Sequence, residues 1–457
     1  MISHRWTARG LSFALLFAIS FGGAQAQTAV TPAAQPRVVP AAPTHPLTVD
    51  DAVAFALRHN PSITLNQQSV TVAQEQVRVA RASGLPTVNL NLSEEYMPSP
   101  SVTSGSSTIS SGGLSSTVAE ATVNQPVWPS TIWRAPTQAA RANVGINQTT
   151  LLRTQQQVAF QTRQSFYELL TAQELLQVAK YSVTVAQEQV KLANATFAAG
   201  TSPRLDVEQA LATLADAEVS LTGAQNAVDV ARAALATQLG LPAGTDIAIT
   251  PPPTLPQAPA EVQPLITKAL SSRPELTELN YQRQQLRANM DQIKLQQTPL
   301  VNATAGYSDT LAGTSGFSAN GLRLGAAVAF AAYNGGKTKA SLAAARTQLA
   351  QIDTNQRQIE LGITFDVRQA WLNLQNALKQ LDSAKQQQVA ADEALRISEL
   401  RYENGEGIYL EVEQARLRST QARTNLAQAR FRAQNAAAQL EYAIGAPPTA
   451  TTLPPAA

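Results

Sequence analysis

Mostly apolar residues recur at alternating steps of three and four along four segments of the chain. This spacing forms the apolar seam of a coiled coil. We therefore expect two long helices, each followed by a turn and a shorter helix, at residues 131–199, 205–239, 337–404 and 410–444. The seams of the first half are Leu176, Ala179, Val183, Ala186, Val190, Ala193 and Phe197, then Leu214, Ala217, Leu221, Ala224, Val228, Ala231 and Leu235. Those of the second half are Leu381, Ala384, Gln388, Ala391, Leu395, Ser398 and Tyr402, then Ser419, Ala422, Leu426, Ala429, Ala433, Ala436 and Leu440.

Between the helices, apolar and polar residues alternate with a period of two. Val88, Leu90 and Leu92 alternate with polar residues just after Gly84-Leu85-Pro86, a sequence that stops a helix. This pattern predicts a helix at 48–82 and a strand at 87–97. A Ser/Gly-rich loop at 99–113 separates that strand from a second one. The predicted strands lie at residues 87–97, 114–127, 300–309 and 321–333, so the helical chain contains two β-hairpins, 87–127 and 300–333.

The two halves of the chain repeat one another. Residues 60–64 match 273–277 at an offset of 213, and DVEQA at 206–210 matches EVEQA at 411–415 at an offset of 205. The change of offset places a longer hairpin loop in the first half. We expect a first structural repeat at 47–250, a Pro-rich linker at 251–261, a second repeat at 262–447 and a C-terminal tail at 448–457.

The N-terminal segment has the pattern of a secretory signal peptide. Arg5 and Arg9 precede an apolar run at 11–21, and Ala24-Gln25-Ala26 supplies the small residues of a cleavage site. We expect removal of residues 1–26, followed by a Pro/Ala-rich extended leader at 27–46. An apolar run of this length is too short for a membrane anchor, which needs about 20 residues.

Charge and composition exclude several functional classes. Residues 1–26 hold two arginines and no acid, so the mature chain keeps 32 of the 34 basic residues against 32 acidic ones. A neutral chain lacks the electrostatic attraction that dominates nucleic-acid binding. The chain has no cysteine and only His4, His45 and His59 as histidines. We therefore expect no disulfide, no metal site, no cofactor and no enzyme activity.

Element lengths point to an elongated assembly. A 69-residue helix would extend about 100 Å at 1.5 Å per residue. The strands are long enough to cross an outer membrane, yet four strands cannot close a barrel by themselves. Two copies would give eight strands and a filled interior, whereas three would give twelve and could leave an aqueous lumen.

Taken together, the duplicated motifs resemble the TolC-like outer-membrane efflux protein family. The resemblance covers residues 47–447 and rests on the order and spacing of duplicated elements. Its carriers are Asn60-Pro61, Arg273-Pro274, Gly84-Leu85-Pro86, Gln125-Pro126-Val127, Tyr333-Asn334-Gly335-Gly336, and the turns FAAGTSPRLDVEQA (197–210) and YENGEGIYLEVEQA (402–415).

The family resemblance implies a mainly α-helical homotrimer. Its coiled-coil helices would form an α-barrel through the periplasm, and its strands would share a twelve-stranded barrel in the outer-membrane lipid. The implied partners are a periplasmic adaptor protein and an inner-membrane transporter. The implied function is passive export of small molecules or proteins. A periplasmic coiled-coil scaffold is the alternative, although it does not explain the two hairpins.

The two turns between long and short helices are the candidate gate. Threefold symmetry would turn any inward-facing acid there into a ring that favours cations. Relative to the best-known family pattern, Gln414 replaces a second acid and Gly407 a basic gating residue. The alternative is that these acids are solvated and simply favour the first helical turn. The candidate gate residues are Asp206, Glu208, Tyr402, Glu411, Glu413 and Gln414, and the candidate adaptor-docking residues are Gly200, Thr201, Gly405 and Gly407.

Aromatic residues flank the predicted strands. Tyrosine and tryptophan favour the interface between lipid and water, where one end of the ring is apolar and the other wet. We therefore expect a membrane-interface position for these side chains rather than ordinary packing. The candidates are Tyr96, Trp128, Trp133, Tyr307, Phe317 and Tyr333.

Overall fold

The computed structural model describes residues 43, 45–97, 102–104, 107–109, 114–200, 202–252, 256–313, 321–404 and 406–448. The expected signal peptide and most of the leader and tail lie outside these ranges. The helices are α1 (Val49–His59), α2 (Pro61–Ala82), α3 (Thr131–Ala198), α4 (Arg204–Gln238), α5 (Gln263–Ser272), α6 (Pro274–Leu295), α7 (Lys337–Glu403) and α8 (Tyr409–Ala443). The strands are β1 (Thr87–Met97), β2 (Val102–Ser104), β3 (Ser107–Ile109), β4 (Leu114–Trp128), β5 (Leu300–Gly313) and β6 (Gly321–Ala329).

The long helices confirm the coiled-coil prediction. α3, α4, α7 and α8 begin and end within one residue of the expected positions. All seven seam residues of α8 are buried. At the far end of α3 the seam weakens, because Phe197 is 46% exposed in the last helical turn.

The single helix expected at 48–82 is wrong, because the chain breaks at Asn60. Asn60 ends α1 and caps α2, its side chain accepting a hydrogen bond from the Ser62 amide at 2.9 Å. Pro61 then occupies the first turn of α2, where its missing N–H costs nothing. Asn60 Nδ2 also donates to the Gln238 carbonyl at the end of α4, at 2.8 Å. Arg273 marks the equivalent break between α5 and α6, and its Nε donates to the Ala443 carbonyl at 2.9 Å.

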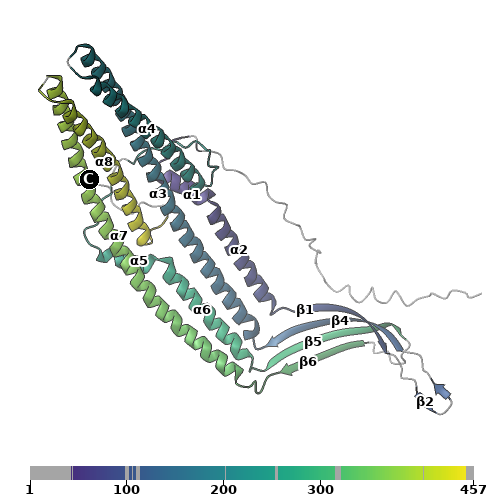
Figure 1. Cartoon of the computed structure of the whole chain (residues 1–457). Helices are drawn as coiled ribbons and strands as arrows, with labels where there is room; N and C mark the ends of the chain where they lie inside the picture. The colour runs from purple at the N-terminus through teal and green to yellow at the C-terminus, as the bar shows by residue number, and fades with distance from the viewer. Residues whose placement is uncertain are drawn as a thin grey trace, which may run out of the picture. The chain divides into compact units, whose positions relative to one another are not determined.

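The helices of the unit Ala42–Ala457 are arranged side by side (Figure 1). α3 packs against α2 and α4 on one side and against α6 and α8 on the other, and α7 packs against α5, α6 and α8. One edge of this layer is therefore formed by α2 and α4, and the other by α7. Two apolar clusters hold it together, one around Phe166 and Leu235 and one around Leu374 and Leu440.

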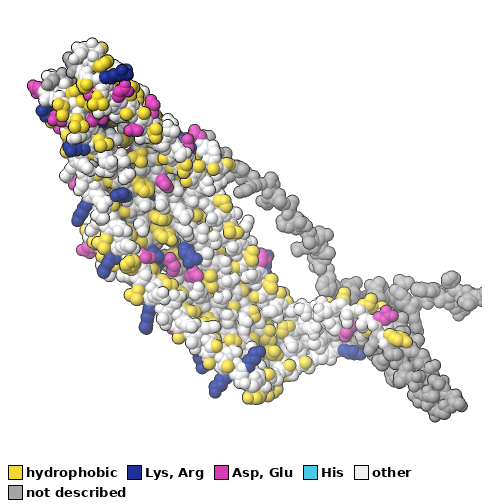
Figure 2. All heavy atoms as spheres, viewed as in Figure 1, with side chains coloured by type: hydrophobic (Ala, Val, Ile, Leu, Met, Phe, Trp, Pro, Cys, Tyr) yellow, Lys and Arg dark blue, Asp and Glu magenta, His cyan; other side chains and the backbone are white. Residues whose placement is uncertain are grey.

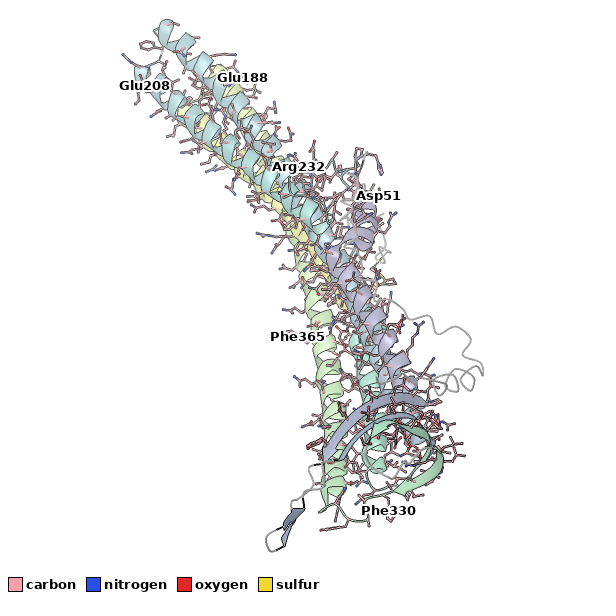
Figure 3. All side chains as sticks on the ribbon, turned by 90° about the vertical axis from the view of Figure 1, so that its right-hand side faces the viewer. Asp51, Glu188, Glu208, Arg232, Phe330 and Phe365 are labelled. Carbon is pink, nitrogen blue, oxygen red and sulfur yellow. The ribbon has the colours of Figure 1, made fainter. Side chains whose placement is uncertain are left out.

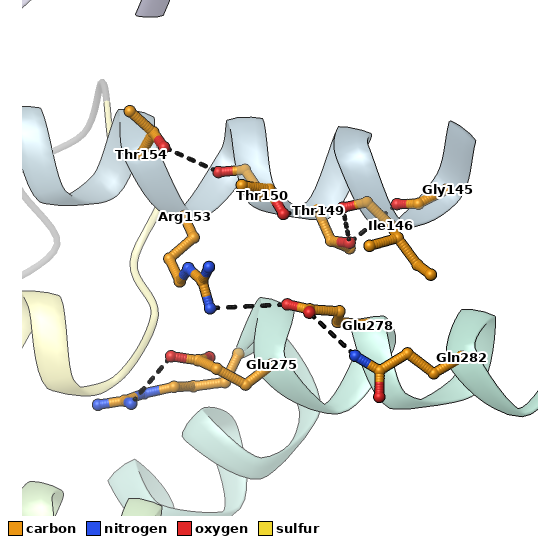
Figure 4. Close-up of polar contacts among 10 residues, drawn as sticks. Gly145, Ile146, Thr149, Thr150, Arg153, Thr154, Glu275, Glu278 and Gln282 are labelled. Carbon is orange, nitrogen blue, oxygen red and sulfur yellow. Dashed lines mark hydrogen bonds and ion pairs between the residues drawn. The ribbon is translucent and has the colours of Figure 1, made fainter. Parts of the chain in front are cut away.

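Polar contacts join α3 to α6 (Figure 4). Arg153 on α3 lies 3.6 Å from Glu278 on α6. Gln282 Nε2 donates to the same carboxylate at 3.1 Å. On α3, Thr149 turns its hydroxyl back to the Gly145 carbonyl at 2.8 Å, which satisfies a buried polar group inside the helix.

The four long strands form one antiparallel sheet in the order β1-β4-β5-β6. Both expected hairpins are present, and β4 and β5 join them. β5 is longer than expected, and β6 ends at Ala329 rather than at 333. Within the expected first-half loop, β2 and β3 form a small hairpin that the sequence pattern did not predict. β1 and β6 each pair on one side only among the described residues, so the sheet has two open edges.

Candidate functional site

The four-stranded sheet has one apolar face whose side chains have no cover among the described residues. Because side chains alternate along a strand, the register places every second residue of β1, β4, β5 and β6 on this face. Leu90 is 80% exposed and Leu324 75% exposed. The apolar residues of this face are Val88, Leu90, Leu92, Ala119, Ala121, Val123, Val301, Ala303, Ala305, Tyr307, Leu322, Leu324, Ala326 and Val328. The register also places Glu94 and Asp309 on this face, towards the end of the sheet where β1 and β5 end. Such a band of exposed apolar residues is typical of a strand surface in contact with lipid.

The opposite face of the sheet is polar. It carries amides and hydroxyls, three glycines (Gly306, Gly321 and Gly325), and one acid and one base whose side chains are described, Glu120 and Arg323. The residues of this polar face include Asn89, Asn91, Glu120, Thr122, Asn124, Asn302, Thr304, Gly306, Ser308, Arg323 and Gly325. The sheet is strongly curved, as Figure 3 shows, so one of its faces is concave and the other convex. Strands with one apolar and one polar face are the pattern of a water-lined membrane barrel.

Four of the candidate interface aromatics are exposed near the sheet. Tyr96, Trp128, Tyr307 and Tyr333 have large solvent-accessible fractions. The side chain of Trp133 packs closely against Gly84, where an added Cβ would lie 2.6 Å from its ring. Phe317 lies outside the described residues. Placement of the exposed aromatics at a membrane interface stays a prediction.

The two turns at the far end of the helices form the tip of the molecule, defined here as residues 199–208 and 402–413. Gly200 adopts a left-handed φ of +76° and closes α3, and its amide bonds to the Phe197 carbonyl at 2.9 Å. In the second turn the amides of Glu406 and Gly407 both bond to the Arg401 carbonyl. Thr201 and Gly405 lie outside the described residues.

Three of the four candidate acids at the tip have arginine partners that sequence reasoning missed. Glu208 lies 3.3 Å from Arg204, and Glu411 lies 3.7 Å from Arg401. Acidic and basic side chains accordingly gather together at this end of the molecule (Figure 2), with Glu208 at the end of the α3–α4 hairpin (Figure 3). Glu413 lies 2.9 Å from Arg416. Among the described residues, Asp206 is the one candidate acid for which no ion pair is found.

Two tyrosines of the second turn contact one another near these acids. The rings of Tyr402 and Tyr409 meet edge to face, with centroids 6.2 Å apart. Burial, and then the negative charge of Asp206, raise the pKa of Tyr402. Burial and the charge of Glu413 raise the pKa of Tyr409, whose hydroxyl donates to Glu413 at 3.0 Å. The structure thus brings Asp206 of the α3–α4 helical hairpin close to Tyr402 of the α7–α8 helical hairpin. Candidate residue Gln414 is exposed on α8.

A row of polar contacts joins α3 to α8 from the tip to the middle of the molecule. Arg416 donates to Gln189 at 2.9 Å, and the Arg423 guanidinium lies over the Tyr181 ring at 4.5 Å. Further along, Arg430 lies 3.4 Å from Glu174, and Arg163 lies 3.0 Å from Glu441. Successive contacts lie seven to eleven residues apart on α3. On α8 they lie nearly the same number of residues apart, in the opposite direction along the chain. The two antiparallel helices are therefore joined in a fixed register.

Arg423 also forms an ion pair with Asp392 on α7. Its Nε donates to Asp392 at 3.2 Å, and the Ser419 hydroxyl donates to the same carboxylate. Burial is the largest influence on the Asp392 pKa and raises it, but the hydrogen bonds from Ser419, Arg423 and Gln388 together outweigh burial and lower this pKa. Asp392 is therefore ionised at neutral pH and links α7 to α8.

The chain matches the model of the family described as outer membrane efflux protein over residues 53–241 and 265–446. It is 24% identical to the outer membrane efflux protein BepC of Brucella suis biovar 1 over 77% of this chain and 74% of BepC. It is 26% identical to the proteases secretion protein PrtF of Dickeya chrysanthemi over 86% of this chain and 87% of PrtF. The solved structure of the channel CusC superposes with a TM-score of 0.75 at 19% identity, over 87% of this chain and 92% of CusC.

These comparisons confirm the family resemblance and the fold expected from the sequence. The family model covers most of the chain, and the solved structure reproduces the combination of long helices with four antiparallel strands. The family consists of channels and not of enzymes. This chain belongs to the outer membrane efflux protein family, the TolC-like channels of the Gram-negative outer membrane.

Proposed function

We propose that three copies of this chain close into one channel, which serves as the outer-membrane duct of a tripartite efflux or type I secretion system. The observation that carries this proposal is the matched pair of open edges. One edge consists of β1, α2 and α4, and the other of β6 and α7. Joining β6 of one copy to β1 of the next satisfies the unpaired backbone groups of both strands. Three copies supply twelve strands, enough to leave a lumen.

Both helical edges carry exposed apolar stripes that a neighbouring copy would cover. On α2, Leu65, Val72 and Val79 repeat every seven residues and are more than half exposed. On α7, Phe365 is 63% exposed and lies on the outward side of the helix (Figure 3). Buried Leu374 lies two and a half turns further on, on the opposite side of α7. The exposed stripe on α7 is therefore not part of the core of the chain itself. The stripe residues of α7 are Leu361, Phe365 and Leu372.

We expect Phe365→Asp to weaken the trimer. Fully burying a phenylalanine contributes about 1.5–3 kcal/mol, and each trimer has three such contacts. Light scattering of the detergent-purified protein should show a trimer for the native chain and for Phe365→Leu, but a lower mass for Phe365→Asp. A native chain that stays monomeric in detergent and in membrane extracts would overturn the proposed assembly.

The tip is the part of the duct that we propose meets a periplasmic adaptor protein, which connects it to an inner-membrane transporter. Gly200, Thr201, Gly405 and Gly407 belong to the turns that would face such an adaptor. BepC is named for efflux and PrtF for secretion of proteases, and both match most of this chain. We therefore assign the cargo only as small molecules or proteins delivered by that transporter.

We expect the gate acids to differ in their effect on ion selectivity. Asp206 raises the pKa of Tyr402 and has no ion pair among the described residues, whereas Glu208 lies 3.3 Å from Arg204. Asp206→Asn should lower the preference for K⁺ over Cl⁻ in planar bilayers by roughly twofold, as the loss of three screened charges implies. The double variant Arg204→Gln with Glu208→Gln, which removes an acid together with the base that it contacts and so leaves the net charge unchanged, should change it less. Equal selectivity in Asp206→Asn and the native channel would remove Asp206 from the gate.

A further inference from the structure

Glu120 and Arg323 lie close together on the polar face of the sheet. In the register, Glu120 is opposite Ser308 on β5, and Arg323 is opposite Gly306, two residues further along the same strand. Their strands β4 and β6 are separated only by β5, and neighbouring strands are about 4.8 Å apart. The acid and the base therefore face the same space from diagonal positions.

That space is a shallow cavity of about 290 Å³, lined by Glu120, Thr122, Thr304, Gly306, Ser308 and Arg323 among others. Gly306 has no side chain to separate the two charged groups. No ion pair between Glu120 and Arg323 is found among the described residues, and the two side chains are half-buried and exposed, respectively. Leu322 and Leu324, the neighbours of Arg323 in sequence, are exposed on the opposite, apolar face. The charged pair thus lies at the depth of the apolar band.

We propose that Glu120 and Arg323 form a charge-balanced collar inside the barrel and that the balance, not either charge alone, determines which ions and cargo pass this level. The inference rests on the trimeric channel proposed above. Three copies place three carboxylates and three guanidinium groups around the lumen at nearly the same depth. Their charges sum to zero, so the collar favours neither sign.

The collar can act on passing solutes because the lumen is narrow and its wall has a low dielectric constant. The Debye length is about 8 Å at physiological ionic strength, comparable to the distance from the wall to the axis of a small barrel. A ring of three unbalanced charges would therefore produce a potential across the whole cross-section. Balance removes that potential and leaves a polar surface that admits cargo of either charge.

The absence of cysteine allows a local test with a single reporter thiol. Thr122→Cys places that thiol on the polar face, on the row of Gly306 and Arg323. The trimer in detergent or proteoliposomes is treated separately with a cationic and an anionic methanethiosulfonate reagent. The ratio of the two modification rates reports the potential at the collar, and it does not depend on the state of the periplasmic gate.

We expect Glu120→Gln in the reporter background to shift the rate ratio toward the anionic reagent by roughly threefold, and Arg323→Gln to shift it toward the cationic reagent by a similar factor. The double variant Glu120→Gln with Arg323→Gln should return the ratio to that of the reporter alone. An unchanged ratio in both single variants, or a double variant that fails to return, would overturn the collar while leaving the channel intact.

The same reporter distinguishes failure of the collar from failure of the channel. If neither charged reagent reaches the Thr122→Cys thiol, this face does not line water, and the proposed channel fails together with the collar. Leu324→Cys on the apolar face is the matched control and should react slowly with both reagents. Equal reaction at Leu324→Cys and Thr122→Cys would contradict the assignment of the two faces.

Discussion

Glu441→Ala is expected to lower the free energy of unfolding by about 3–5 kcal/mol, the cost of leaving a buried charge without its partner. Glu441 on α8 lies 3.0 Å from Arg163 on α3, and the side chains are only 4% and 7% exposed. Removing the carboxylate leaves the buried Arg163 guanidinium without its ion-pair partner. The midpoint of thermal unfolding, followed by circular dichroism of the helices in detergent, measures the effect.

Two further variants separate this ion pair from the rest of the seam between α3 and α8. Glu174→Ala removes the acid of the exposed pair with Arg430, so it should cost less than about 1 kcal/mol. Replacing both Arg163 and Glu441 by leucine should restore most of the lost stability, because no buried charge then lacks a partner. A Glu441→Ala protein as stable as the Glu174→Ala protein would contradict the expectation.

The long helices could be predicted from the sequence because local signals and long-range packing agree there. Their seams keep the 3,4 spacing for many turns, and Gly200 and Gly240 stand just beyond the ends of α3 and α4. The breaks at Asn60 and Arg273 were missed because proline is compatible with the first turn of a helix. What fixes each break is a tertiary contact, the hydrogen bond from Asn60 or Arg273 to the end of α4 or α8.

The candidate site was predicted only in part for a similar reason. Arg204 and Glu208 lie four residues apart on α4, and Glu413 and Arg416 lie three residues apart on α8, so the spacing within each pair indicates a contact from the sequence alone. The contact of Arg401 with Glu411 spans a turn, and no periodic pattern indicates it.

The seam between α3 and α8 could not be predicted from the sequence pattern, because heptads show that helices have partners but not which helices are neighbours.

The charged residues on the polar face of the sheet, in contrast, could be predicted from the sequence pattern. Alternation along the strands already placed Glu120 away from Ala119, Ala121 and Val123, and Arg323 away from Leu322 and Leu324. These two residues could have been found by asking which charged groups share the inner face of the predicted hairpins.

Gly240→Ala is expected to destabilise the protein more than either of two matched glycine replacements. Gly200, Gly240 and Gly445 each follow the end of a long helix and have φ between +68° and +80°. This conformation costs an L-residue about 1–2 kcal/mol. At Gly240 an added Cβ would also lie 2.5 Å from the His59 carbonyl oxygen, which is backbone and cannot turn away. At Gly445 the nearest atom is the Ser272 hydroxyl at 3.1 Å, and at Gly200 nothing lies within 4 Å.

The expected order of destabilisation follows from those surroundings. Gly200→Ala should cost about 1 kcal/mol, Gly445→Ala somewhat more, and Gly240→Ala about 3 kcal/mol or more, because backbone strain and a steric clash act together. Thermal unfolding of the three variants under one detergent condition tests the order. Equal losses in Gly240→Ala and Gly200→Ala would mean that the end of α1 moves away from α4 at no cost. That result would contradict the rigid junction in which Asn60 ties the α1–α2 break to the last carbonyl of α4.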